Sequence, residues 1–148
     1  MRIAMPRGDI RWQRFIICTP FGEPADIEFT NIYFTVKKDT TEEDYIFQKS
    51  LKRGEITKVG QGDYQLKIDS KDTEDMLFGD YVFDVQVSYY DLLKETFVGD
   101  FTVLPEVTFY HNEEAEETEQ DPNIIIKVST REILRLKTSL EITTSEEP

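Results

Sequence analysis

Hydrophobic and polar residues alternate with a period of two along most of the chain, which is typical of half-buried β-strands. The clearest case is NIYFTVKK at 31–38, where Ile32, Phe34 and Val36 share one face and polar or aromatic residues take the other. The segment GDYVFDVQVSYYD at 79–91 repeats the pattern, with Tyr81, Phe83, Val85 and Val87 on one face. Both segments are rich in β-branched and aromatic residues, so they predict strands.

Weaker strand patterns fill the rest of the first 110 residues. We expect strands at 10–18, 45–51, 56–59 and 64–68, and two short strands within 92–110, separated at Gly99-Asp100 and Pro105. The GQGD stretch at 60–63 predicts a hairpin, and the acids of DSKDTEDML at 69–77 predict a single helical turn that crosses between sheets. Seven or eight strands separated by turns indicate an all-β, Ig-like antiparallel β-sandwich.

The charge pattern divides the chain into three parts. Residues 113–121, EEAEETEQD, hold six acidic residues and no basic one, so we expect 113–122 to be an acidic linker. The sandwich then occupies 1–112. Residues 123–148 form a C-terminal appendage with a short strand (NIIIKVST), a short helix that begins with a capping box at Ser129–Glu132, and a disordered end.

Composition narrows the classes of partner. The net charge is −13, which would repel phosphate backbones and anionic lipids, so we expect neither nucleic-acid nor membrane binding. The longest apolar run, Phe15–Cys18, is too short to span a membrane. Cys18 is the single cysteine and sits within that run, so it is expected to be a small buried hydrophobe.

The sequence contains no constellation that predicts catalysis, a cofactor or a metal ion. His111 is the sole histidine, and no phosphate-binding loop or zinc-ligand spacing is present. Asp84 lies in an apolar strand, where we expect it on the outer face beside a basic neighbour; a carboxylate-based hydrolase is the alternative. Asp69, Asp72 and Asp75 suit a helix start better than a calcium loop, because their spacing of three does not match that loop.

Two further features suggest binding. Tyr89, Tyr90, Phe109 and Tyr110 fall near predicted strand ends and could form a platform for a sugar, although core or turn packing is the commoner role. The tripeptide Arg7-Gly8-Asp9 occurs in integrin ligands, but here it directly precedes an aromatic strand. We therefore interpret it as the tight turn at which the first strand begins, with Asp9 accepting local amide hydrogen bonds.

Taken in order, these segments resemble a known family. The opening RGD is followed by GEPADI, NIYFTVKK, GDYQLKIDSKDTEDMLFGDYVFDVQV and GDFTVLPEVT. This order is similar to small structural proteins of tailed phages and prophages, including the N-terminal Ig-like domains of baseplate upper proteins. The resemblance covers about residues 6–108, and Phe83 stands where the family pattern has a tyrosine.

The resemblance implies a non-catalytic virion protein of a tail, baseplate or head decoration, made in the bacterial cytoplasm of the host. Its expected partners are other virion proteins and further copies of itself in a homo-oligomer. A module that binds host-surface carbohydrate is the alternative function. These expectations rest on the family pattern, whereas composition and spacing establish only the fold class and the absence of recognised chemical motifs.

Overall fold

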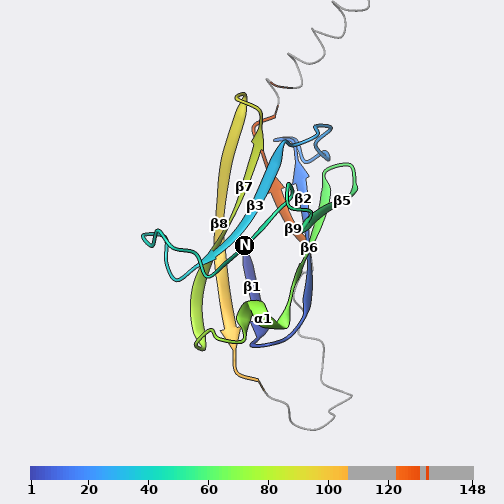
Figure 1. Ribbon diagram of the computed structural model, residues 1–148. Helices are drawn as coiled ribbons and strands as arrows, with labels where there is room; N and C mark the ends of the chain where they lie inside the picture. Colours follow the sequence, from blue (N-terminus) through green and yellow to red (C-terminus); the bar gives the residue numbers. More distant parts are fainter. Residues whose placement is uncertain (107–122, 131–132, 134–148) are drawn as a thin grey trace, which may run out of the picture.

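A computed structural model describes residues 1–106, 123–130 and 133, and the described chain forms a sandwich of two β-sheets (Figure 1). Its elements are β1 (Arg2–Pro6), β2 (Arg11–Cys18), β3 (Asn31–Lys37), β4 (Phe47–Ser50), β5 (Ile56–Gly60), β6 (Asp63–Ile68), α1 (Ser70–Thr73), β7 (Gly79–Tyr89), β8 (Leu93–Leu104) and β9 (Asn123–Lys127). One sheet has the order β1-β8-β7-β3-β4, and the other has the order β5-β6-β2-β9.

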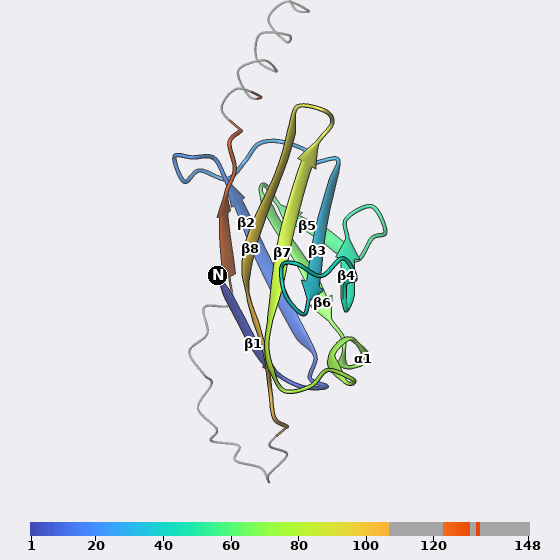
Figure 2. The same ribbon diagram turned by 90° about the vertical axis from the view of Figure 1, so that its left-hand side faces the viewer.

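The connections follow an immunoglobulin-like plan. The chain crosses between sheets from β2 to β3 and again, through α1, from β6 to β7, while β7 and β8 form a long hairpin (Figures 1 and 2). Strands β2, β6 and β5 occupy the places of B, E and D in such a sandwich, and β3, β7 and β8 those of C, F and G. The predicted fold class is therefore confirmed.

The expected antiparallel pairing needs a correction at two edges. Strand β1 runs parallel to the end of β8, with Arg2 opposite Asp100, and β9 runs parallel to β2, with Arg14 opposite Asn123. Strand β1 was not predicted, because RIAMP is short, contains Arg2 and Pro6 and is followed by Arg7. Residues 1–106 thus hold eight strands, which equals the upper estimate for the sandwich, and β9 is the short strand expected in 123–148.

The Arg7-Gly8-Asp9 tripeptide follows β1 instead of preceding the first strand. It forms the turn between β1 and β2, in which Gly8 adopts a φ of 79° and donates its N–H to Thr73 Oγ1 at 2.8 Å. The Arg7 guanidinium lies 4.3 Å from the centre of the Phe78 ring, and its Nε is 3.3 Å from a Glu106 oxygen. The N–H of Asp9 donates to the Pro6 carbonyl, and the expected amide hydrogen bond to the Asp9 carboxylate is not seen among the described residues.

Strand β8 is continuous where two short strands were expected. It pairs with β7 from Leu93 to Val103, and the register passes through Gly99-Asp100 without a bulge. Gly99 does not bend the strand; it makes room for the ring of Phe83, which lies on the opposing strand. The glycine therefore reflects a close packing contact, which the local sequence cannot distinguish from a strand break.

The segment 123–130 belongs to the sandwich. Ile124 and Ile126 of β9 are buried, Val128 and Ile133 join the same core, and the Val128 N–H donates to the Cys18 carbonyl at 2.8 Å. The expected short strand is present, but it completes a sheet and is not held apart as an appendage. The predicted linker 113–122 and most of the predicted terminal helix lie outside the described residues.

The core is built from the inward faces of both sheets, largely as the alternation predicts. Ile32, Phe34 and Val36 of β3 are buried, and so are Phe83, Val85 and Val87 of β7. Cys18 is buried and free, as expected. In β2 the inward positions include Gln13, which is fully buried, whereas Trp12 points outward and lies 5.8 Å from the Lys67 ammonium.

Candidate functional site

The outer face of the five-stranded sheet carries a polar hollow where β4, β3 and β7 lie side by side. Strand β3 turns Tyr33, Thr35 and Lys37 outward, and across the ladder Thr35 faces Gln48 of β4 and Asp84 of β7. Because Thr35 is shorter than the Tyr33 and Lys37 that flank it, the sheet surface is lowest at Thr35. Side-chain length along one strand therefore creates the hollow.

Two adjoining depressions of about 110 and 270 Å³ share Thr35, Lys37 and Asp84. The smaller one extends toward Val82 and Val98 on the β8 side. The larger one extends toward β4, and we call it the outer furrow. It is lined by Tyr33, Thr35, Lys37, Glu43, Tyr45, Gln48, Asp84 and Gln86.

The loop between β3 and β4 supplies one wall of the outer furrow. Figure 1 shows this loop projecting outward from the five-stranded sheet, and both Glu43 and Tyr45 line the depression. Lys37 Nζ donates to the Glu42 carbonyl at 3.0 Å, and the Asp39 carboxylate accepts from the Thr41 N–H at 2.8 Å. These contacts hold the loop against the strand from which it leaves.

Asp84 lies at the centre of the hollow, on the outer face and beside a basic neighbour, as its place in the strand predicts. Partial burial raises the pKa of its carboxyl, and the positive charge of Lys37 opposes that shift. The Asp84 carboxylate accepts no hydrogen bond from the residues that the structure describes. It is therefore a partly desolvated acceptor in contact with an open depression.

Two glutamines complete the polar floor. Gln48 Nε2 donates to Thr35 Oγ1 at 3.1 Å, and Gln86 Nε2 donates to Thr96 Oγ1 at 3.2 Å. Each bond uses one of the two N–H groups of its amide, so the carbonyl oxygen and the second N–H of each glutamine remain available. Together with Asp84, the outer furrow presents three acceptor groups on neighbouring strands.

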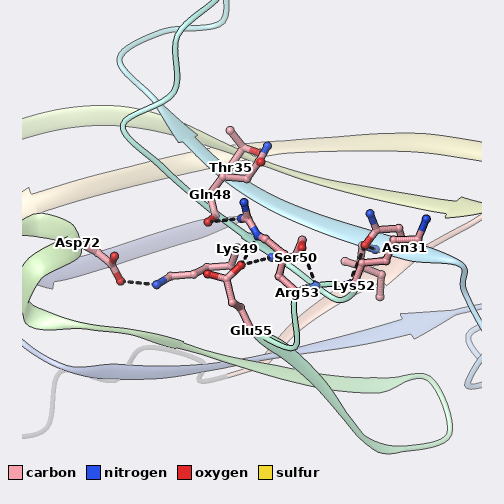
Figure 3. A network of polar contacts seen from close by, with 10 residues as sticks. Asn31, Thr35, Gln48, Lys49, Ser50, Lys52, Arg53, Glu55 and Asp72 are labelled. Atoms are coloured by element: carbon pink, nitrogen blue, oxygen red, sulfur yellow. Dashed lines mark hydrogen bonds and ion pairs between the residues drawn. The ribbon is translucent and has the colours of Figure 1, made fainter.

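A polar network fixes β4, which forms the far side of the outer furrow (Figure 3). Arg53 donates to the Gln48 carbonyl at 2.8 Å and to Glu55 at 2.6 Å, and the Ser50 N–H donates to the same Glu55 oxygen at 3.2 Å. Below them Lys49 Nζ pairs with Asp72 of α1 at 2.8 Å (Figure 3). The short edge strand is thereby held in place, and Gln48 with it.

The three acids Asp69, Asp72 and Asp75 act separately. The Asp72 carboxylate accepts the Asp69 N–H at 2.8 Å and pairs with Lys49, and an Asp69 oxygen lies 3.3 Å from Lys67 Nζ. Asp75 is exposed beyond the end of α1. The acids at the start of α1 serve the helix and its neighbours, which agrees with their interpretation as helix-start residues.

Exposed apolar side chains gather at the end of the sandwich that bears α1. This α1 end consists of Ile10 and Trp12 from the start of β2 and of Leu77 and Phe78 from the link into β7. Figure 1 places the β1–β2 turn, α1 and the end of β8 together at this end. Leu77 is 78% exposed and Ile10 is 58% exposed, so their side chains are available to a neighbour.

The residues singled out as a sugar platform are not brought together with the outer furrow. Tyr89 and Tyr90 pack edge to face, with ring centres 5.0 Å apart, at the β7–β8 turn, and Tyr90 is 69% exposed. Phe109, Tyr110 and His111 lie outside the described residues. Tyr33, Gln48 and Gln86 were not predicted as site residues. The outward phase of NIYFTVK and VFDVQV could have indicated Tyr33 and Gln86, whereas no comparable signal marks Gln48.

Comparisons of the chain with models of protein families, with curated proteins and with solved structures find no match. Among the described residues, no group of histidine, cysteine and acidic side chains is placed to hold a metal ion. The helix found in the same residues is too short to cross a membrane. Function is therefore inferred from the geometry of the outer furrow and of the α1 end.

Proposed function

We propose that the protein is a non-catalytic assembly module of a tailed-phage or prophage virion, in a tail, a baseplate or a head decoration. The observation that carries this proposal is the α1 end, where Ile10, Trp12, Leu77 and Phe78, each at least 49% exposed, lie on segments that meet at one end of the sandwich. Exposed apolar side chains gathered at one place are typical of protein–protein contacts. The virion setting is taken from the family pattern of residues 6–108.

The α1 end is suited to a firm contact because its backbone is well anchored. Gly8 is tied to α1 through Thr73, and Arg7 is tied to Phe78 and to Glu106. A rigid surface loses little conformational entropy when it binds. Its charges are mixed: Arg7 and Lys67 lie next to the apolar residues and pair with Glu106 and Asp69, so this end is not uniformly acidic despite the net charge of −13.

The proposed partners are other virion proteins and further copies of the chain. We expect the purified protein to self-associate as its concentration rises, and the double variant Leu77→Ser/Phe78→Ser to remain monomeric in light scattering. The matched control is Tyr90→Ser/Leu92→Ser, which removes exposed apolar side chains from the opposite end and should associate like the natural protein.

Two results would contradict this function. One is a natural protein that stays monomeric at high concentration and binds no virion protein. The other is the absence of the chain from virions purified after phage induction of a strain that encodes it, measured by mass spectrometry. Saccharide binding is the second candidate function, and the outer furrow is the observation that favours it.

A further inference from the structure

We propose that the outer furrow is a binding site for an uncharged saccharide. This site is separate from the α1 end, on which the proposed assembly function depends. The chemical reason lies in three groups: acceptors on the floor, two tyrosine rings at the sides, and a lysine that balances the charge of the central carboxylate. These groups come from β3, β4, β7 and the loop between β3 and β4.

The floor of the outer furrow presents acceptor groups that no donor among the described residues fills. Gln48 and Gln86 each donate one amide N–H, to Thr35 and Thr96, which leaves their carbonyl oxygens as acceptors, and the Asp84 carboxylate has no donor among the described residues. Three acceptor groups on neighbouring strands are complementary to a ligand that carries several hydroxyl groups side by side. Because Asp84 is already partly desolvated, its carboxylate loses little further water when a hydroxyl group donates to it.

Aromatic rings at the sides suit the less polar faces of a sugar ring. Tyr33 lines the outer furrow from β3, and Tyr45 lines it from the loop, where its side chain is 52% exposed. The C–H groups of a pyranose can pack on such rings while its hydroxyls point to the floor. Tyrosine is favoured at binding surfaces because it offers a large contact area at a low entropic cost.

The charge of the outer furrow favours a neutral ligand over a cation. Lys37 lines the same depression as Asp84, and its positive charge acts on that carboxylate. A lysine or arginine from a protein partner would have to compete with Lys37 for Asp84. A polyol meets no such competitor, and the N–H groups of Lys37 left over from its bond to Glu42 can donate to a sugar oxygen.

The test is an NMR titration of the ¹⁵N-labelled full chain with methyl glycosides of glucose, galactose, mannose, N-acetylglucosamine and N-acetylgalactosamine, and with short oligomers of each. We expect at least one probe to shift the backbone amides of residues 33–37, 45–48 and 82–86. The variants Tyr45→Ala and Asp84→Ala should weaken that binding at least about tenfold, which corresponds to about 1.4 kcal/mol. Tyr45 lies in the loop between β3 and β4 and Asp84 on the outer face of β7, and an unfolding midpoint no lower than that of the natural protein verifies that the variants fold.

Tyr90→Ala is the matched control, because it removes an exposed tyrosine from the β7–β8 turn, far along the strand from Asp84. We expect it to bind the saccharide like the natural protein. The proposal is overturned if no probe shifts the amides of the outer furrow, if Tyr45→Ala and Asp84→Ala bind normally, or if Tyr90→Ala alone loses binding. None of these results bears on self-association through the α1 end, so the two proposals fail independently.

Discussion

Gly99 shows how a single residue without a side chain can be required by packing between strands. A β-carbon at this position would lie 2.5 Å from Cζ of the Phe83 ring and 2.8 Å from the Met1 carbonyl oxygen. Both contacts are far too short, and the backbone oxygen cannot move away as a flexible side chain could. The conformation of β8 itself would accept any residue here, so the constraint is one of space.

We therefore expect Gly99→Ala to lower the free energy of unfolding by about 2 kcal/mol. Gly60→Ala is the control, because the nearest atom to its added β-carbon would be Asp63 Cβ at an ordinary 3.6 Å. Chemical denaturation measures both. Equal stabilities of Gly99→Ala and Gly60→Ala would contradict this prediction, because they would show that the Phe83 ring moves aside freely. The double variant Gly99→Ala/Phe83→Leu should recover part of the stability lost in Gly99→Ala, and no recovery would contradict the prediction as well.

Asp84 gives the outer furrow a dependence on pH. Burial raises the pKa of its carboxyl above the value in the unfolded chain, so the folded state holds the proton more tightly between the two pKa values. The free energy of unfolding must then fall as the pH rises through that interval. Above the interval the folded protein bears the cost of a partly desolvated charge.

We expect Asp84→Asn to be more stable than the natural protein at neutral pH by about 0.5 kcal/mol, a small effect because Asp84 is only partly buried. The difference should vanish below a pH of about 4, where the carboxyl is protonated in both states. Denaturation at a series of pH values measures this difference in the free energy of unfolding. Asp91→Asn in the β7–β8 turn is the control. A difference that is constant with pH would refute the role of the Asp84 charge.

At the scale of elements, α1 and β4 are joined by an ion pair that is nearly buried. The Lys49 ammonium lies 2.8 Å from an Asp72 oxygen, and both side chains are only 10% exposed. Asp72 also accepts the Asp69 N–H at the start of α1. One carboxylate therefore caps the crossing turn and fixes the edge strand that borders the outer furrow.

Lys49→Met should cost about 3 kcal/mol, because it leaves the Asp72 charge buried without its partner. The double variant Lys49→Met/Asp72→Asn should recover part of that loss, since no unpaired charge remains. Lys67→Met tests the more exposed pair with Asp69 and should cost less than about 1 kcal/mol. Thermal and chemical unfolding provide the comparison, and similar losses for Lys49→Met and Lys67→Met would contradict the prediction.

For the whole molecule, β9 decides whether the chain is one folded unit in its described part. Ile126 is 1% exposed and belongs to the core shared by both sheets, whereas its neighbour Ile125 is 56% exposed on the same strand. The Ser129 N–H also lies 3.2 Å from both carboxylate oxygens of Glu95, which belongs to the opposite sheet. Strand β9 thus links the two layers.

We expect Ile126→Ala to lower the free energy of unfolding by about 3 kcal/mol in a single cooperative transition. Ile125→Ala, the matched control, should change it by no more than about 0.5 kcal/mol. Circular dichroism during denaturation measures both. An unchanged stability of Ile126→Ala, or a separate early transition, would mean that β9 contributes nothing to the sandwich core.

The sequence determined where most strands lie and which way their side chains point. The alternation in 31–37 and 79–89 was sufficient to predict two strands and their buried faces, because each inward residue meets the core whichever strand lies beside it. The hairpin at 60–63 and the helical turn after Ile68 were also predicted, since the conformations of turns and caps depend on residues close in sequence. These features are local, and local residues specify them.

The tertiary structure alone decided which strands are neighbours, and with them the candidate sites. The pairing of β1 with β8 and of β9 with β2 depends on contacts between residues about a hundred positions apart, which no local pattern encodes. The outer furrow arises only because Gln48, Thr35 and Asp84 fall in one row across three strands. Alternation fixes the face that a side chain takes, but the register between distant strands fixes its neighbours, and a binding site is made of neighbours.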